Sequence, residues 1–331
     1  MVDEGQPWRL PRRTEHPGMP FERDALDAHA VRKPERLEVR ELAEVEMVDV
    51  FTYDGGGGNP CPVVADAAGM GANEMREVAR RHGHESGFVL PAEDDAHDFR
   101  FRFFVPNHEM EMCAHATVGA LWVLARQGRL PRGPVRVATA SGTVTGYVKA
   151  CDAGSWQVEI TQPPGRAVPL TPPRMDEVCM ALGINRDALA DLPARNAVTS
   201  RVKTLVPVRD PEILNGLAPD PVSVEAVCAR IGSTGLYPYV VVDRAARMFE
   251  ARHFPRSSGY PEDAATGIAA AALAFGLLHD GTVPPDDGVI RVHQGRAMGR
   301  LSEIRVRIGF VGTRPVGCLL GGEVAPAHSK A

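Results

Sequence analysis

Two segments of this chain, His115–Gln127 and Thr266–Leu278, are apolar around most of the circumference of the helix that each would form. A helix that is apolar on all sides has to be buried on all sides. Neither segment reaches the ~20 apolar residues that a helix needs to span a membrane. The chain therefore has to surround two buried helices with other elements.

Each apolar segment follows a similar arrangement of residues. Phe103–Pro106 resembles the end of a strand and leads through a loop to the first segment, and His253–Pro255 leads in the same way to the second. This repetition predicts two similar α+β domains, each with mainly antiparallel strands wrapped around a central helix. The length of 331 residues agrees with two domains of roughly 150 residues each.

Composition suggests where these domains begin and end. Residues 1–40 mix charges and prolines with little periodicity, which is typical of a flexible tail. Alternatively, Trp8, Leu10 and Phe21 could anchor this segment as an arm on the body or on a partner subunit. The stretch Gln162–Pro173 is the most linker-like part of the interior. We expect an N-terminal extension over 1–45, an N-terminal domain over 46–165 and a C-terminal domain over 166–331.

The other elements are expected to be short, because 33 glycines and 28 prolines favour turns. The glycine-rich stretch Gly55–Pro60 is predicted to be one such turn. Residue patterns predict further helices at Asn73–His82, Met175–Leu182 and Val222–Ile231. They predict strands at Glu44–Tyr53, Cys61–Ala65, Gly87–Pro91, Phe99–Pro106, Val135–Ala138, Gly142–Val148, Trp156–Thr161, Arg201–Val208, Tyr237–Val242, Ala246–Phe254, Glu303–Phe310 and Val316–Val324.

Charge and cysteine usage exclude several classes of protein. The chain has 37 basic and 42 acidic side chains, a net charge of −5, whereas nucleic-acid binders are usually basic. Six scattered cysteines without a C-x-x-C pair indicate reduced thiols in the cytosol. The N-terminus lacks the apolar segment of a secretory signal. We expect a cytoplasmic protein that binds neither nucleic acid nor a membrane.

The sequence also argues against common cofactors. The run Gly55–Gly58 is followed by Asn59, Pro60 and another strand, not by a helix that could hold a pyrophosphate. The histidines fit no zinc-binding spacing. We therefore predict neither a metal nor a cofactor.

The starts of the two apolar helices are better candidates for a site. Free N–H groups at a helix start bind anions, so two starts that face one cleft would hold a small carboxylate. Asp263 and Thr266 lie at the second start, where they could equally be capping residues. Glu85 stands at the entrance of a strand. It is either a solvated loop residue or a partly buried general base.

Five segments closely resemble the PhzF-like family of phenazine-biosynthesis isomerases. They are VDVFTYDGGGGNPCPVV, HESGFVLP, FRFRFFVPNHEMEMCAHATVG, ARHFPRSSGYPEDAATGIAAAALA and HQGRAMGRLSEIRV. The resemblance runs from about Met47 to the C-terminus and implies the diaminopimelate-epimerase-like fold of two pseudo-symmetric domains. It also implies an active site in the cleft between them, no cofactor and a homodimer.

The family's site residues can be carried over motif by motif. The resemblance places the catalytic glutamate at Glu85, the cleft histidine at His115 and the aspartate at Asp263. In the phenazine enzyme it implies that the glutamate moves a proton in a dihydro-hydroxyanthranilate and isomerises the ring diene, while the other two orient the substrate. The substrate-binding positions would be Cys113, Ala114, Ala116, Thr266, Gly267, Ile268, Asn59 and Ser86.

Several residues depart from the family pattern. Ile268 replaces a small polar residue, Ala114 a glycine and Ala264 a proline, so we expect a more apolar cleft and an altered substrate. Cys113 lies near a thiol position of the cofactor-independent racemases, but their second thiol would fall near Ala265, so a structural thiol is the better interpretation.

These observations predict a cofactor-independent isomerase of a small carboxylate-bearing cyclic or enamine substrate, in secondary metabolism. A C–C bond hydrolase or tautomerase using the same site is one alternative, and a non-catalytic interaction module is another.

Overall fold

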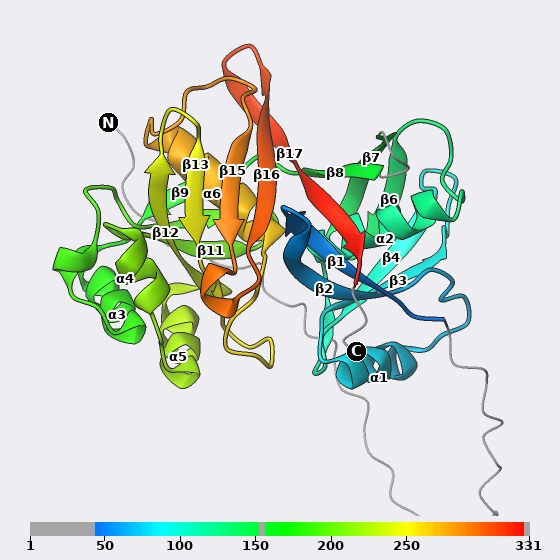
Figure 1. The fold of residues 1–331 in the computed structure, drawn as a ribbon, viewed down its shortest axis with the longest axis horizontal. Helices are drawn as coiled ribbons and strands as arrows, with labels where there is room; N and C mark the ends of the chain where they lie inside the picture. The colour runs from blue at the N-terminus through cyan, green and yellow to red at the C-terminus, as the bar shows by residue number, and fades with distance from the viewer. Residues whose placement is uncertain (1–43, 152–155, 328–331) are drawn as a thin grey trace, which may run out of the picture. The chain divides into compact units, whose positions relative to one another are not determined.

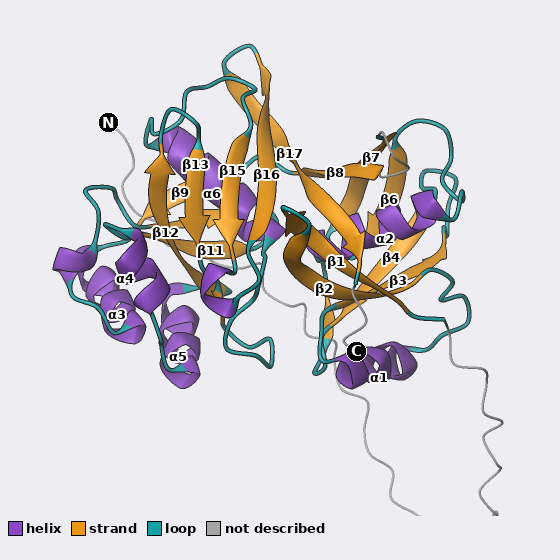
Figure 2. Ribbon diagram, viewed as in Figure 1, coloured by secondary structure: helices purple, strands orange, loops and turns teal. Residues whose placement is uncertain are grey.

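The computed structural model describes residues 44–151 and 156–327. The predicted N-terminal extension therefore lies, apart from its last two residues, outside the described residues. The described residues belong to one compact unit, Ala43–Ala331. Within it, two helices are enclosed by strands, as the apolar segments required (Figures 1 and 2).

The first half of this unit wraps around helix α2 (Ala114–Arg126). Every residue of α2 except Arg126 is buried, which explains its apolar circumference. The strands that pack on α2 include β1, β2, β3, β7 and β8. This half comprises β1 (Glu46–Tyr53), β2 (Gly56–Val64), α1 (Ala72–His82), β3 (Ser86–Pro91), β4 (Phe99–Phe104), β5 (Glu109–Met110), β6 (Val135–Thr139), β7 (Gly142–Ala150) and β8 (Trp156–Gln162).

The second half repeats this plan around α6 (Gly267–His279), in which eleven residues in succession, Gly267–Leu277, are buried. Strands β9, β10, β11, β16 and β17 pack on α6. The other elements are β9 (Arg166–Pro169), α3 (Pro172–Leu182), β10 (Arg195–Val198), β11 (Val202–Pro207), α4 (Pro211–Gly216), α5 (Pro221–Ile231), β12 (Gly235–Asp243), β13 (Met248–Ala251), β14 (Phe254–Pro255), β15 (Ile290–Gln294), β16 (Ser302–Val311) and β17 (Arg314–Pro326). Two short 3₁₀ turns, Arg186–Ala188 and Arg296–Met298, complete the half.

Most strands pair antiparallel, as predicted. Parallel pairing is confined to β2 with β3, β4 with β6, β11 with β12 and β13 with β15 among the described strands. The α+β architecture with a central helix in each half is therefore confirmed.

The last strand, β17, joins the two halves. It pairs with β16 of its own half, with β8 through Cys318–Gly322 and with β1 through Val324–Pro326. Figure 1 shows it running from the second half into the first. The boundary expected near residue 165 stays a prediction, because the sheets of the two halves are continuous through this strand.

The glycine-rich stretch is not the turn that the sequence suggested. Strand β2 begins at Gly56, and only Asp54 and Gly55 form the turn. A Cβ on Gly57 would lie 1.8 Å from the carbonyl oxygen of Leu301, so glycine is needed for the close approach of two backbones.

The predicted linker Gln162–Pro173 is likewise structured. It contains β9, which pairs with β10, and the first turn of α3, where Pro172 and Pro173 occupy the positions that tolerate proline. Strands β10 and β15 and helix α4 were not predicted. In the described part of the chain, no helix is both long and apolar enough to span a membrane.

Candidate active site

The N-termini of α2 and α6 meet in the middle of the molecule. A Cβ added to Gly267 would lie 3.0 Å from the Cβ of Ala114, so the first turns of the two helices are in contact. The first N–H groups of a helix have no acceptor within the helix, and residues at both helix starts line one cavity. The cavity has a volume of about 140 Å³. Its lining includes eight of the residues that the sequence predicted: Glu85, Cys113, Ala114, His115, Asp263, Thr266, Gly267 and Ile268.

The other three predicted residues lie around the cavity, not on its wall. Asn59 supports Asp263 from behind through a hydrogen bond of 2.7 Å. Ser86 is fully buried, and its hydroxyl donates to the carbonyl of His84. Ala116 is fully buried and packs against Gly87. None of the three lines this cavity, although Asn59 lines a second cavity beside the same two carboxylates.

Glu85 stands immediately before β3, and its carboxylate reaches the α2 start. One oxygen accepts a hydrogen bond of 2.9 Å from the Cys113 thiol, and the other accepts one of 2.6 Å from the Tyr260 hydroxyl. The side chain is 14% exposed, so it is mostly shielded yet open to the cavity. Glu85 is thus a carboxylate held in place by two neutral donors.

Cys113 is a hydrogen-bond donor in this arrangement. Burial, and then the charge of Glu85, raise the pKa of the Cys113 thiol well above its ordinary value. A protonated thiol is a poor nucleophile. The structure therefore agrees with the interpretation of Cys113 as a structural thiol.

His115 offers a free ring nitrogen. Its Nδ1 lies 3.3 Å from the Cys113 sulfur and 3.5 Å from the Glu85 carboxylate. Its Nε2 is buried and has no hydrogen-bond partner among the described residues. A buried polar atom without a partner is costly, and a bound ligand would supply one.

Glu85, Cys113 and His115 also lie close enough to share a metal ion, with ligand atoms within 4.8 Å of one another. Metal binding would require the thiolate. The absence of a metal stays a prediction.

Asp263 is fixed more tightly than Glu85. Its Oδ1 accepts from the Asn59 amide, and its Oδ2 accepts from the Thr266 hydroxyl at 2.5 Å. Burial alone would raise the pKa of Asp263, but the neighbouring His253 ring and Thr266 hydroxyl outweigh burial, so the pKa is lowered. Thr266 occupies the N-cap position of α6 without capping it, because its hydroxyl binds Asp263 instead.

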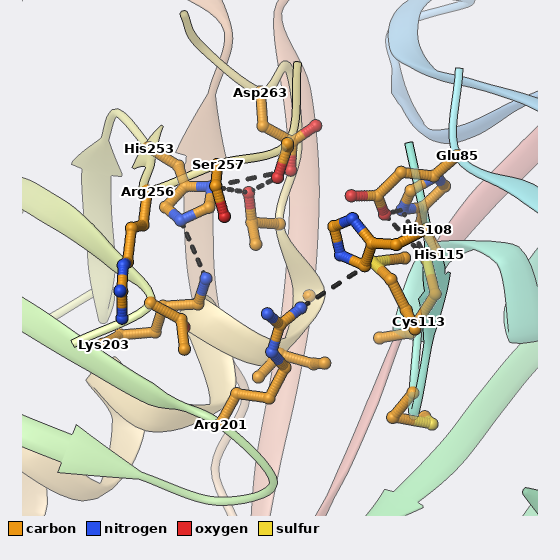
Figure 3. A pocket seen from close by; sticks show the side chains of 18 residues that line it. Glu85, His108, Cys113, His115, Arg201, Lys203, His253, Arg256, Ser257 and Asp263 are labelled. Carbon is orange, nitrogen blue, oxygen red and sulfur yellow. Dashed lines mark hydrogen bonds and ion pairs between the residues drawn. The ribbon is translucent and has the colours of Figure 1, made fainter. Parts of the chain in front are cut away.

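Behind Asp263 lies a chain of hydrogen bonds that the sequence did not reveal. Lys203 Nζ lies 2.9 Å from His253 Nε2, and His253 Nδ1 lies 3.0 Å from the Thr266 hydroxyl (Figure 3). Burial and the charge of Lys203 lower the pKa of His253 to about 4, so the ring is neutral. A neutral ring that accepts from Lys203 at Nε2 donates from Nδ1, and Thr266 then donates to Asp263.

Lys203 and two arginines give the cavity a positive wall. Lys203 extends from β11, Arg201 precedes the same strand, and Arg256 follows β14. Burial first, and then the charge of Arg201, lower the pKa of Lys203 to about 7. The expectation of a more apolar cleft was therefore incomplete: Ile268 and Ala114 do line the cavity, but these cations line it as well. The available signal was two basic residues alternating in the otherwise apolar strand Arg201–Val208.

A second and larger hollow, of about 620 Å³, is lined by the same two carboxylates. Glu85 and Asp263 line both spaces, and Tyr260 lines the larger one while donating to Glu85. Glu85 thus borders two cavities.

The chain has two pseudo-symmetric halves, each wrapped around a buried helix, and the N-termini of the two helices meet at a polar cavity. This arrangement defines the diaminopimelate-epimerase-like fold. Among solved structures, the chain aligns with a PhzF-family phenazine biosynthesis protein of Bacillus anthracis at a TM-score of 0.75 and 23% identity, covering 85% of this chain and 95% of that one. A probable proline racemase of Agrobacterium radiobacter aligns at 0.60 and 12% identity, covering 86% and 90%. Both share the fold.

The sequence comparisons specify the family. A family model described as "Phenazine biosynthesis-like protein" matches residues 48–327. The uncharacterized isomerase YddE of Escherichia coli O157:H7 is 31% identical over 277 residues, which cover 82% of this chain and 92% of the relative. An uncharacterized isomerase of Deinococcus radiodurans is 31% identical over 282 residues, covering 83% and 90%. The chain belongs to the phenazine-biosynthesis-like PhzF family and is an isomerase of that family.

Proposed function

We propose that this isomerase moves a proton within a small carboxylate-bearing cyclic or enamine substrate, with Glu85 as the base that removes and returns it. The observation that carries the proposal is the position of the Glu85 carboxylate. It opens to the cavity, is oriented by the Cys113 thiol and the Tyr260 hydroxyl, and stands beside the α2 start.

The surrounding groups suit the charge that develops when a proton leaves carbon. The first N–H groups of α2 and α6 bind the substrate carboxylate or carbonyl oxygen and stabilise an enolate-like state. His115 offers its buried Nε2 to the same region. Asp263, with both oxygens engaged by the protein, holds the α6 start in place.

No step in this scheme needs a cofactor, since the proton leaves and re-enters through one carboxylate. The family name supports a role in the biosynthesis of a phenazine-like secondary metabolite. We further propose that the protein acts in the cytoplasm as a homodimer, as its resemblance to the family implies.

The test is proton exchange in deuterated water. The wild type is incubated with dihydro-hydroxyanthranilate and a panel of cyclic carboxylates and enamines, and deuterium incorporation is measured by mass spectrometry. Glu85→Gln keeps the size of the side chain but removes the base, and we expect a loss of about 10²–10⁴-fold in exchange, the usual contribution of a general base.

Glu93→Gln is the matched control, because Glu93 is an exposed residue 71% accessible at its side chain. It should exchange like the wild type. Near-native exchange in a folded Glu85→Gln variant would refute the role of Glu85. In ordinary water, a product whose mass differs from that of the substrate would indicate bond cleavage instead of isomerisation.

A further inference from the structure

The charged groups of the cavity are not paired with one another. Glu85 accepts from a thiol and a phenol, and Asp263 accepts from an amide and a hydroxyl. The two carboxylates of the site are therefore held by neutral donors, and the basic side chains beside them are the histidines His115 and His253. The cations of the site therefore do not pair with these two carboxylates.

Arg201 has no carboxylate partner among the described residues. Its guanidinium points into the cavity, where the contact it makes is to the Met110 sulfur, 3.7 Å away (Figure 3). A sulfur is a weak acceptor for a group that can donate five hydrogen bonds. Other half-buried arginines of this protein form close ion pairs, for example Arg300 with Asp49 at 2.6 Å and Arg102 with Glu109 at 2.7 Å.

Lys203 stands two residues further along the same face of the chain. It is buried, and its ammonium group is hydrogen-bonded to the neutral His253 ring, which carries no charge to balance it. Figure 3 shows Lys203 and Arg201 across the cavity from Glu85 and Cys113. The positive wall is thus separated from the proton-transferring carboxylate by the space that a ligand would occupy.

We propose that Arg201 and Lys203 form a subsite for a second anionic group of the substrate, so that the substrate is a small dianion. One anionic group binds at the helix starts and the other at β11, which fixes the molecule across the cavity with its reacting carbon toward Glu85. The guanidinium supplies a planar pair of donors that matches a carboxylate or a phosphonate, and the ammonium adds a further donor. The proposal rests on the proposed function for the position of the first group.

The test compares the binding of dianions and monoanions by isothermal titration calorimetry. The probes are glutarate against butyrate, isophthalate against benzoate, and 3-phosphonopropionate as the phosphorus-bearing dianion. We expect at least one dianion to bind about tenfold or more tightly than its monocarboxylate, as one charge-assisted hydrogen bond would give. A preference for 3-phosphonopropionate over glutarate would identify the second group as phosphorus-based, and the reverse would identify a carboxylate.

Arg201→Gln should abolish this preference because it removes the donors for the second anionic group, and Arg201→Lys should restore part of it. Arg174→Gln, on the exposed surface of α3, is the matched control and should bind like the wild type. Monoanions that bind as tightly as all three dianions, or a preference that survives in a folded Arg201→Gln, would overturn the proposal.

Proton uptake provides a separate readout for Lys203. The groups that influence the pKa of Lys203 are Arg201 and His253 at close range, with Asp263, Glu85 and Cys228 further off. At pH 8 an anion bound beside Lys203 should draw a proton onto it. Titrations in two buffers of different ionisation enthalpy would then show uptake in the wild type and none in Lys203→Met.

If the wild type takes up no proton when the anion binds, the proposal that Lys203 belongs to the subsite is overturned. These measurements require no turnover. A failure of deuterium exchange at Glu85 would therefore leave them intact, and their failure would leave the exchange intact, so that the two proposals are tested separately.

Discussion

The two helix starts share a backbone plan but differ in their side chains. At the α2 start, the Glu85 carboxylate accepts from the Cys113 thiol and the Tyr260 hydroxyl, and its side chain is 14% exposed. At the α6 start, the Asp263 carboxylate accepts from the Asn59 amide and the Thr266 hydroxyl, and its side chain is 8% exposed. Both carboxylates border the same two cavities. Under the proposed function, two related halves divide the work: the more exposed carboxylate faces the ligand, and the other holds the site together.

The largest expected effect tests this division through stability. Asp263→Ala leaves the Thr266 hydroxyl without its acceptor and the buried Lys203 without its nearest anion, and we expect a loss of about 3 kcal/mol in the free energy of unfolding. Glu85→Ala removes a side chain that solvent can partly reach, and we expect a loss of about 1 kcal/mol. Urea denaturation of both variants measures the difference. Equal losses would show that the two carboxylates are structurally equivalent.

The next prediction concerns the contact between the helix starts. Gly267→Ala would place a Cβ 3.0 Å from both Ala114 and Leu320 and 3.2 Å from Phe51. Such overpacking costs about 1–3 kcal/mol. Ala114→Gly would remove one of the three obstacles, so the double variant should recover part of this cost. Thermal denaturation of the two single variants and the double variant completes the cycle. If the changes in Tm caused by the two substitutions are strictly additive, the two helix starts are not in steric contact.

The smallest effect is a dependence of stability on pH. The pKa of Lys203 falls from its ordinary 10.5 to about 7 on folding. Below pH 7 Lys203 is protonated in both the folded and the unfolded chain, so folding buries its charge at full cost. Between pH 7 and 10.5 the unfolded chain binds the proton that the folded chain has lost, so the free energy of unfolding rises with pH.

Lys203→Met should therefore raise the Tm more at pH 6 than at pH 9, with a difference between the two gains of about 2–4 °C. Lys149→Met, at an exposed position, is the control and should show the same change at both pH values. An equal gain at both pH values in Lys203→Met would mean that Lys203 titrates in its ordinary range.

The sequence predicted those parts of this comparison that depend on local pattern. The buried helices were visible because they are apolar on all sides. Cys113 and Asp263 lie in motifs at the helix starts, and Glu85 lies in a motif at the start of β3. The chain from Lys203 through His253 to Thr266 was not visible, because it depends on how β11, β12 and β14 pair. Residues 50 apart meet only through that register.

In the glycine-rich stretch, by contrast, the local pattern was visible but gave a wrong prediction. Locally, Gly55–Pro60 has the composition of a turn, and the sequence analysis assigned it as one. The stretch is a strand because it pairs with β1, and the distant Leu301 backbone comes so close that only glycine fits at Gly57. Tertiary contacts of this kind cannot be read from a window of neighbouring residues.

The pairing of β17 with β1 and β8 has a consequence for the order in which the protein matures. The first half is synthesised long before Arg314–Pro326, so its sheet lacks a central member until β17 has been made. Contacts between such distant parts of a chain form slowly. The cavity therefore takes its final shape only after β17 has paired, and a chain truncated before β17 would lack this closure even though every residue lining the cavity had already been made.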